Sequence, residues 1–432
     1  MKLYWYGVEP GMQDPSAMKD LPRRRLFLFL SGFALANAGD IFTQVAIFWT
    51  ALSLTGRALS LATLGGAWTI TMAVMGLISG PIVDRFNRRS ILAWLHVMLA
   101  LLSLCLFIVV LTDHLQMWHL WAYLVGNAVC GVPSTMAFNS MLPDVVRKER
   151  LVRINGLLSS WGMTDNMIES ALSGIVLALW GPAPIFLFNA VMFLFGCFSA
   201  LAVPLASGRV RDETRHEAWQ PIADLRLTLR YILRSRLLRR YILLGQFGSL
   251  IFAPLFFMAP VVAVAIGMGS EGYGFLQSLT LAGVLAGSLL ASTIGTQWPK
   301  VKMWVGGQLL YAAGFLSLGI HVHPAIAFPA MFLFGFGCTG GRVYQNTLVQ
   351  QILPSAHRGR VFGIDGFVGG ALQPLALALA MMFVDSAGVG PVLIGLAALT
   401  ALLAVSQFIL LPIREKDWVL AEPEHTAAPS AE

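Results

Sequence analysis

The sequence predicts an all-α membrane protein of twelve transmembrane helices, arranged as two similar groups of six. Three observations support this prediction: long apolar runs, a one-sided distribution of basic residues, and an internal repeat. The composition already excludes an ordinary soluble protein, because 57% of the 432 residues are hydrophobic and only 12% are Asp, Glu, Lys or Arg. Soluble domains carry roughly 25% charged residues.

Twelve apolar runs are long enough to cross a bilayer, whose core of about 30 Å requires roughly 20 residues of helix. The runs are Leu26–Leu54, Leu59–Val83, Ile91–Leu111, Trp118–Leu142, Ile154–Trp180, Ile185–Leu205, Tyr241–Ile266, Gly274–Ile294, Met303–Ile320, Ala325–Val349, Val361–Val384 and Pro391–Leu411. They predict an N-terminal tail (1–25), a six-helix bundle (26–205), a linker (206–240), a second six-helix bundle (241–411) and a C-terminal tail (412–432). Apolar residues at helical spacing between arginines predict a basic amphipathic helix in the linker, lying on the membrane surface.

The basic residues lie almost entirely on one side of the predicted membrane. All 29 Lys and Arg residues except Arg57 and Arg342 fall in the tails or in the connections on that side. Basic residues concentrate in cytoplasmic segments, so we expect both termini to be cytoplasmic. This placement explains the net charge of +7 without a nucleic-acid partner. A cleaved signal peptide ending near Ala36 is disfavoured, because the first apolar run continues to Leu54.

A seven-residue pattern occurs twice, 210 residues apart. The segments RLVRING (150–156) and RVFGIDG (360–366) each follow a basic turn and precede a long apolar run. Parallel repeats of six helices build one class of transporter, in which the substrate site lies between the repeats near the midplane of the membrane. The repeat therefore predicts two similar bodies that rock about a central site.

The connection after the second apolar run reads GPIVDRFNRR (80–89). It resembles the G-x-x-x-D-R-x-G-R-R loop signature of the major facilitator superfamily, with Asn87 at the place of the last glycine. The resemblance implies a conformational latch against the other half, with Arg88 or the start of the eleventh helix as the partner of the carboxylate. The latch residues are Gly80, Asp84, Arg85, Arg88 and Arg89. The alternative is a basic turn that only fixes the topology. The matching loop of the second half, 299–302, lacks the aspartate, so the predicted latch is one-sided.

Longer pieces narrow the resemblance to one bacterial branch. The segments NAGDIFTQVAIFWTALSLTG (37–56), LPDVVRKERLVRING (142–156) and RGRVFGIDG (358–366) resemble macrolide-efflux proteins and siderophore exporters, and the similarity extends from Arg23 to Leu411. Members of this branch are proton-driven antiporters. The resemblance implies a monomeric protein of the bacterial inner membrane that uses the proton gradient, without a cofactor or metal. One departure is that the fifth apolar run reads ESALSG from Glu169, where antiporters often have a stretch rich in Gly and Pro.

Ionisable residues inside the apolar runs are the candidate transport residues, since each costs about 2.5–3.5 kcal/mol at mid-membrane and is functional by default. Asp40 is flanked by Asn37 and Gln44 on one helical face. Asp165 and Glu169 are one turn apart on another helix, and two such carboxylates in a poorly hydrated cavity tend not to be ionised together. Arg342, with Gln345 and Asn346 one turn on, is the only cation inside a predicted span. The superfamily fold implies that Asp40 and Arg342 face each other. The alternative for these residues is a set of structural ion pairs.

The predicted cavity combines aromatic and polar side chains. Phe252, Phe256 and Phe257 follow Gln246 in the seventh run, and Asn127 and Gln373 lie in the fourth and eleventh. Such a lining suits an amphipathic organic substrate, although each aromatic residue alone could equally face lipid or another helix. The G-x-G-x-x-G match at 335–340 lies within an apolar run rather than after a strand, so it predicts close helix packing and not a nucleotide site.

Together these observations predict proton-coupled export of a small amphipathic organic compound, such as a drug, macrolide or siderophore. Two alternatives stay open. The first is uptake of a nutrient by proton symport, with Arg342 holding an anionic substrate. The second is a sensor or an intramembrane enzyme, against which the buried carboxylates and the repeat both argue. The partners expected are the small-molecule substrate, protons and the lipid bilayer.

Overall fold

The computed structural model describes residues 22–146, 148–203, 236–294, 299–352 and 355–410, and within them all regular structure is helical. The first group of helices comprises α1 (Arg23–Thr55), α2 (Leu59–Arg85), α3 (Arg88–Leu111), α4 (Met117–Val145), α5 (Lys148–Trp180) and α6 (Ala183–Leu201). The second comprises α8 (Arg236–Phe257), α9 (Ala259–Ala265), α10 (Ser270–Ile294), α11 (Lys300–Ile320), α12 (Pro324–Ile352), α13 (Ser355–Ala387) and α14 (Val389–Leu410). The predicted amphipathic helix of the linker lies outside the described residues.

Each predicted apolar run corresponds to one helix, apart from the seventh. That run is divided at Met258 into α8 and α9, with Pro254 inside α8 and a proline in the first turn of α9. Hydropathy does not change across this point, so a search for apolar runs does not detect the break. Within the described residues, eight helices are long and apolar enough to cross a membrane: α1, α2, α3, α6, α10, α11, α13 and α14. The chain is therefore a multi-pass membrane protein, and the count of twelve spans stays a prediction.

The two groups of helices use the same packing scheme. In the first, α1 packs against α5 and α6, α3 against α4 and α6, and α2 against α4. In the second, α8 packs against α13 and α14, α11 against α12 and α14, and α10 against α12. If α8 and α10–α14 are taken as the counterparts of α1–α6, these are the same five pairs. The repeated heptapeptide lies at equivalent places, near the starts of α5 and α13.

Contacts between the groups run mainly through two helix pairs, α2 with α13 and α5 with α10. Since α10 is the counterpart of α2 and α13 that of α5, each of these pairs corresponds to the other. The two groups are therefore related by approximate twofold symmetry. Glycines bring α5 and α10 into backbone contact, because a Cβ on Gly174 would lie 2.5 Å from the carbonyl oxygen of Ser270. The Ser270 hydroxyl donates to the carbonyl of Gly174 at 3.1 Å. Backbone contact of this kind permits close helix approach without a hydrophobic driving force.

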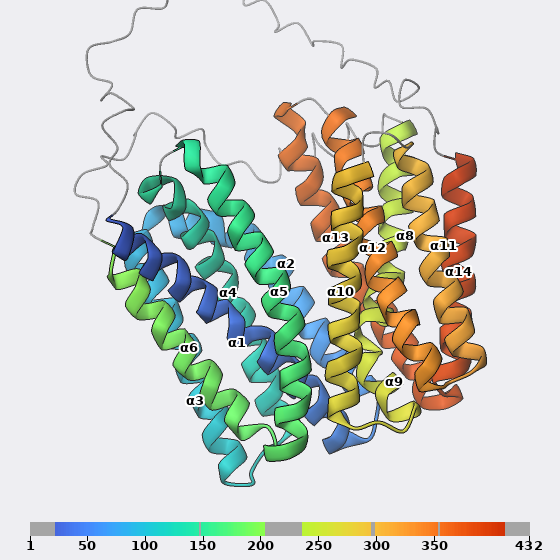
Figure 1. Ribbon diagram of the computed structural model, residues 1–432, viewed down its shortest axis with the longest axis horizontal. Coiled ribbons are helices and arrows are strands. Elements are labelled where there is room, and N and C mark those ends of the chain that lie inside the picture. Colours follow the sequence, from blue (N-terminus) through green and yellow to red (C-terminus); the bar gives the residue numbers. More distant parts are fainter. Residues whose placement is uncertain (1–21, 147, 204–235, 295–298, 353–354, 411–432) are drawn as a thin grey trace, which may run out of the picture.

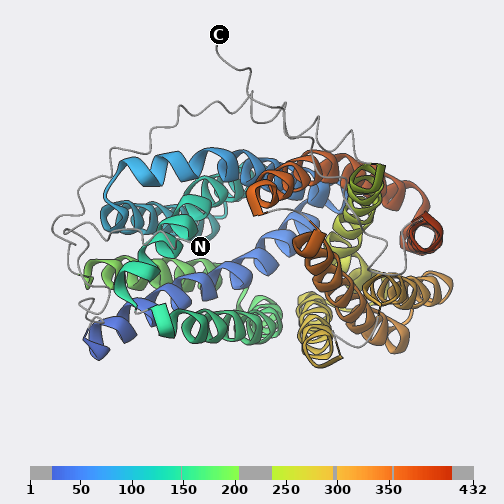
Figure 2. The ribbon, with the colours of Figure 1, turned by 90° about the horizontal axis from the view of Figure 1, so that it is seen from above.

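The groups meet at one end of the molecule, which we call the convergent end. Figure 1 shows the helices of the two groups approaching each other around α9 and spreading apart toward the opposite end, and Figure 2 shows the groups side by side from above. The aromatic contacts between the groups lie here: Phe48 of α1 is 5.0 Å from Phe257 of α8, ring centre to ring centre, and Trp49 is 6.3 Å from Tyr273. The predicted transport residues of α1 and α5 lie between the two ends.

Candidate functional site

Asp40 lies near the middle of the 33-residue helix α1, half-buried between neighbouring helices. The side chain of Asn127 in α4 donates from Nδ2 to Asp40 Oδ1 at 3.1 Å. The preceding residue is Gly39, whose Cα packs directly against Asn189 of α6. A side chain at position 39 would hold α1 and α6 apart, so the glycine lets Asp40 sit deep in the first group. The structure thus brings together two polar residues that the sequence predicted separately.

A second polar cluster fixes the helix that carries Asn127. Tyr123, one turn earlier on α4, accepts a hydrogen bond from Asn189 Nδ2 at 2.7 Å and lies 3.3 Å from the hydroxyl of Ser103 in α3. Ser103 donates its proton to the carbonyl of Leu99, so Tyr123 donates to Ser103. The cluster therefore ties α4 to α3 and α6, one turn from the Asn127 side chain that donates to Asp40.

Glu169 and Asp165 lie one turn apart on α5, as predicted. Glu169 is 6% exposed, and its Oε2 atom has no hydrogen-bond partner within the described part of the chain. Its charge interacts with those of Asp165 and Asp40. One turn further on, the Ser173 hydroxyl donates to the carbonyl of Phe42 at 2.7 Å, which ties α5 to α1 two residues from Asp40. Repulsion among three neighbouring carboxylates opposes their simultaneous ionisation.

The other predicted transport residues are only partly described. Asn37 is exposed and donates to the carbonyl of Phe33 within its own helix at 2.7 Å, while Gln44 is half-buried on α1. The backbones of Arg342, Gln345 and Asn346 belong to α12. Their side chains, and that of Gln246, lie outside the described residues. The opposition of Asp40 and Arg342 across the two groups therefore stays a prediction.

The loop between α2 and α3 explains why asparagine is accepted in place of the signature glycine. Asn87 is the N-cap of α3, and its side-chain oxygen accepts from the backbone N–H groups of Arg89 (3.1 Å) and Ser90 (3.4 Å). Asparagine is among the residues preferred at this position. Gly80 lies near the end of α2 with open space around it. The side chains of the remaining two latch residues, Asp84 and Arg85, lie outside the described residues.

The two described arginines of this loop bind other helices of the first group. Arg88 donates to the carbonyl of Ser140 in α4 at 3.1 Å, and Arg89 donates to the carbonyl of Leu201 at the end of α6 at 2.7 Å. Cations near a helix C-terminus are favourable, because the unpaired carbonyl groups there carry partial negative charge. Both arginines therefore fasten the loop to its own half, and the predicted partner of the latch carboxylate stays a prediction.

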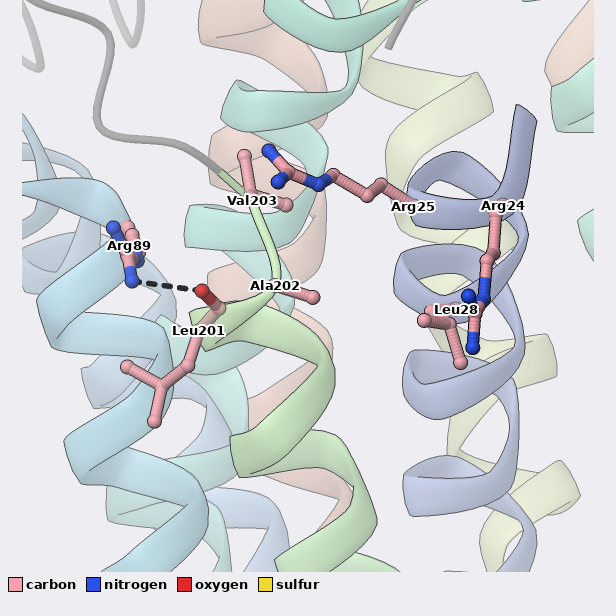
Figure 3. Close-up of a pocket in the computed structure, with 7 residues that line it drawn as sticks. All are labelled: Arg24, Arg25, Leu28, Arg89, Leu201, Ala202 and Val203. Carbon is pink, nitrogen blue, oxygen red and sulfur yellow. Dashed lines mark hydrogen bonds between the residues drawn. The ribbon is translucent and has the colours of Figure 1, made fainter. Parts of the chain in front are cut away.

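A cavity of about 420 Å³ lies beside this loop. It is lined by Arg24, Arg25, Leu28, Arg89, Leu201, Ala202 and Val203. Figure 3 shows Arg89 and Arg25 reaching toward the end of α6 from two sides, with Arg24 lying along α1 beside Leu28. Arg25 precedes Asp40 by 15 residues, which is roughly 22 Å of helix at 1.5 Å per residue. The cavity therefore places arginine side chains beside the C-terminal end of α6. It is separate from the carboxylates of α1 and α5.

The aromatic residues of the seventh predicted span form a packed row. The ring centroids of Phe252 and Phe256 on α8 are 5.8 Å apart, and Phe252 also lies 5.5 Å from Phe334 of α12. Phe257 is buried against Phe48 of α1. Phe257 is therefore a contact between the groups, as the alternative interpretation held, whereas Phe252 and Phe256 are half-buried.

Sequence reasoning missed Tyr123 and Asn189, both buried in the polar cluster. The available signal was a lone asparagine within the otherwise apolar sixth run, since a buried amide requires partners. It also missed Asp385, at the end of α13, because the predicted eleventh span stopped one residue earlier.

Comparison with known proteins finds a matching family and several bacterial efflux proteins among the relatives of the chain. A family model described as transmembrane secretion effector matches residues 25–429. Macrolide efflux protein A of Streptococcus pyogenes is 21% identical over 375 residues, covering 84% of this chain and 90% of that protein. Multidrug efflux pump Tap of Mycolicibacterium fortuitum is 25% identical over 419 residues, covering 93% and 99%.

Solved structures share the fold at low sequence identity. A bacterial homolog of the human lysosomal transporter Spinster has a TM-score of 0.70 at 12% identity, covering 93% of this chain and all of that one. The nucleoside transporter NupG has a TM-score of 0.69 at 13% identity, covering 90% and 99%.

Proposed function

The chain belongs to the transmembrane secretion effector family of the major facilitator superfamily, and on that premise we propose that it exports a small amphipathic organic compound in exchange for protons. It is a membrane transporter of the macrolide-efflux branch and not an enzyme. Export rather than uptake is favoured by the relatives, whose names describe efflux of macrolides or of several drugs.

The observation that carries the proposal is Asp40 held by Asn127 and electrostatically linked to Glu169. A carboxylate in the middle of a span is costly and is retained for function. In its ionised form Asp40 is stabilised by the Asn127 amide, and a bound proton removes the charge. The carboxylates of α5 add repulsion that a proton relieves. The cluster therefore binds a proton when the site opens to one side and releases it when the site opens to the other.

The twofold packing scheme supports alternating access as the transport mechanism. In this proposal the bundles 26–205 and 241–411 rock about the α2–α13 and α5–α10 contacts. With both termini in the cytoplasm, the convergent end faces outward, and the structure represents the state in which that end is shut. The protein would act as a monomer in a bacterial inner membrane, driven by the proton gradient without a cofactor.

The substrate class is proposed from the half-buried aromatic row of α8. Phe252 and Phe256 offer apolar faces, and the carboxylates of the first group offer charge. Such a combination suits compounds with a large apolar body and a polar or cationic group. Macrolides, cationic dyes and siderophores are the first compounds to test.

The test is proton movement in proteoliposomes that contain a pH-sensitive dye, with an imposed pH gradient. Wild type is compared with Asp40→Asn and with Asp113→Asn, the same chemical change at an exposed residue of the α3–α4 connection. We expect at least one compound to dissipate the gradient through wild type and Asp113→Asn but not through Asp40→Asn. Equal proton movement in all three proteins would show that Asp40 is structural.

The same vesicles test the direction of transport. Export requires labelled substrate to move against the proton flux, whereas symport moves both in one direction. Accumulation of substrate together with protons would favour the nutrient-uptake alternative.

A further inference from the structure

A carboxylate of the second group caps a helix of the first. Asp385, at the end of α13, accepts a hydrogen bond from the backbone N–H of Ala58 at Oδ1 (2.6 Å) and from that of Leu59 at Oδ2 (3.0 Å). Residues 58 and 59 form the N-terminus of α2, more than 320 positions earlier in the chain. Each carboxylate oxygen is therefore engaged by a different N–H group across the interface between the groups.

The N-terminus of α2 has no cap of its own. The N-cap residue is Ala58, which has no side-chain hydrogen-bond acceptor, and the structure records no side-chain cap from it. The first N–H groups of any helix lack partners within the helix, and alanine is among the poor residues at this position. Asp385 supplies the missing acceptors and places a negative charge at the positive end of the helix dipole. Hydrogen bonds to an ionised acceptor are stronger than neutral ones.

This cap lies in the part of the interface that is closed. Below it, the contact between α2 and α13 continues, because a Cβ on Gly66 would lie 3.2 Å from Pro374 and one on Gly370 would lie 2.8 Å from Ala73. The first of these contacts joins the first half of α2 to the second half of α13, and the second lies near the middle of both helices. Around Gly76 and Gly80, further along α2, there is open space. Separation of the groups at the convergent end must break both hydrogen bonds of Asp385.

We propose that Asp385 is a positioning residue of the transport cycle, which holds the convergent end shut by capping α2 and must release it each time that end opens. This inference rests on the alternating-access part of the proposed function. It also changes the view of α2 and α13 as a pair. Asp84 lies near the end of α2, where the family resemblance implies Arg88 or the start of α13 as its partner, and Asp385 lies near the end of α13 and meets the start of α2. With the start of α13 as the partner of Asp84, the pair would have one carboxylate for each closed state.

The test is the distance between the groups at the convergent end, measured by pulsed electron resonance. Spin labels are placed on Leu54→Cys in α1 and Ile320→Cys in α11, both exposed, after the four native cysteines are changed to serine. We expect Asp385→Asn to raise the ratio of open to shut molecules about threefold to tenfold, as the loss of charge-assisted bonds at an exposed site implies. Asp113→Asn is the matched control and leaves the ratio unchanged.

A second variant separates a latch from a plain helix cap. Arg57→Asn places a side-chain acceptor two residues before Leu59, the spacing at which an N-cap side chain accepts from a helix N–H group, so in the double variant with Asp385→Asn it gives α2 a cap from its own helix group. If Asp385 is a latch, the double variant folds as wild type does but still opens more often. If Arg57→Asn returns the distance distribution to that of wild type, or if Asp385→Asn leaves the distribution unchanged, the latch is disproved.

The outcome is independent of the substrate. A shift in the distances without proton-coupled export of any compound would leave the latch standing and remove the proposed proton coupling. Proton-coupled export together with unchanged distances in Asp385→Asn would support the proposed proton coupling and disprove the latch.

Discussion

The two groups of helices share a packing scheme but differ in what lies inside them. Among the side chains that the structure describes, the acidic residues in the middle of a helix are Asp40, Asp165 and Glu169, all in the first group. In the second group, helices meet backbone to backbone. A Cβ on Gly335 of α12 would collide with the carbonyl of Thr280 in α10, and one on Gly307 of α11 would lie 2.4 Å from the carbonyl oxygen of Gly337 in α12.

Within the first group, Gly39 and Gly126 have neighbours of a different kind. Gly39 and Gly126 pack against the side chains of Asn189 and Leu102. Side-chain contacts leave room for hydrogen-bonded polar groups and for small rearrangements, whereas backbone contacts hold helices at a fixed separation. The comparison teaches that the same packing scheme surrounds mid-helix carboxylates in the first group and backbone-to-backbone helix contacts in the second. Each prediction below tests one side of that contrast.

The largest effect is expected from Gly335→Ala in the second group. The added methyl meets a carbonyl oxygen that belongs to a helix backbone and does not move aside, so we expect a loss of about 2–3 kcal/mol of stability, typical of overpacking. Gly126→Ala is the matched change in the first group. Its methyl would lie 2.7 Å from the end of the flexible Leu102 side chain, and the gain in helix propensity offsets part of the cost. Thermal unfolding in detergent measures both, and equal destabilisation would contradict the contrast.

The next largest effect is expected from Asn127→Leu. This change removes the hydrogen bond to Asp40, and bonds to charged groups contribute about 1.5–3 kcal/mol. We therefore expect proton-coupled transport to fall about tenfold, since 1.4 kcal/mol corresponds to a factor of ten. The control is Gln407→Leu in the second group, which removes a buried amide that donates to the carbonyl of Leu244 at 3.2 Å. That variant is expected to keep its coupling, and a similar loss in both would show that the first group has no special role.

The sequence predicts the helices well because the membrane imposes a simple rule. Apolar runs, basic connections and the repeat place each long helix to within a few residues at most ends. The rule fails at Met258, where a helix break lies inside an apolar run, and prolines 254 and 260 were the only local signal. The described part of the structure agrees with the all-helical expectation and with the superfamily fold.

The site is less predictable, because it depends on which helices meet. Asp40 and Asn127 could each be singled out as polar residues in apolar runs, but their spacing of 87 positions says nothing of a contact. Asp385 could not be recognised, since a carboxylate near a helix end is ordinary until a distant helix lacking its own cap is placed beside it. Such pairings arise from the packing of α2 on α13 and are absent from local patterns.

A smaller effect is expected from Tyr123→Phe, which tests whether the polar cluster of the first group only supports α4. The change leaves the Asn189 amide, fully buried, without its acceptor. An unsatisfied buried group costs about 1–3 kcal/mol, and relaxation of the amide toward other acceptors places the expected loss near the lower bound. Because the side chain that donates to Asp40 is Asn127 and not Tyr123, proton coupling is expected to persist in the surviving folded protein. A loss of coupling with unchanged thermal stability would instead place Tyr123 in the proton path.

The smallest effect is expected from Arg89→Gln at the exposed end of the first group. The guanidinium donates to the carbonyl of Leu201 and lies near the C-terminus of α6, an arrangement that contributes about 0.3–1 kcal/mol when exposed. We expect thermal unfolding to shift by only a few degrees and transport to continue. Arg57→Gln, which removes a charge from the exposed connection after α1, is the control. If Arg89→Gln abolished transport while Arg57→Gln did not, Arg89 would act in the conformational latch as well as in capping α6, and the chemistry of the first group would extend from Asp40 to its far end.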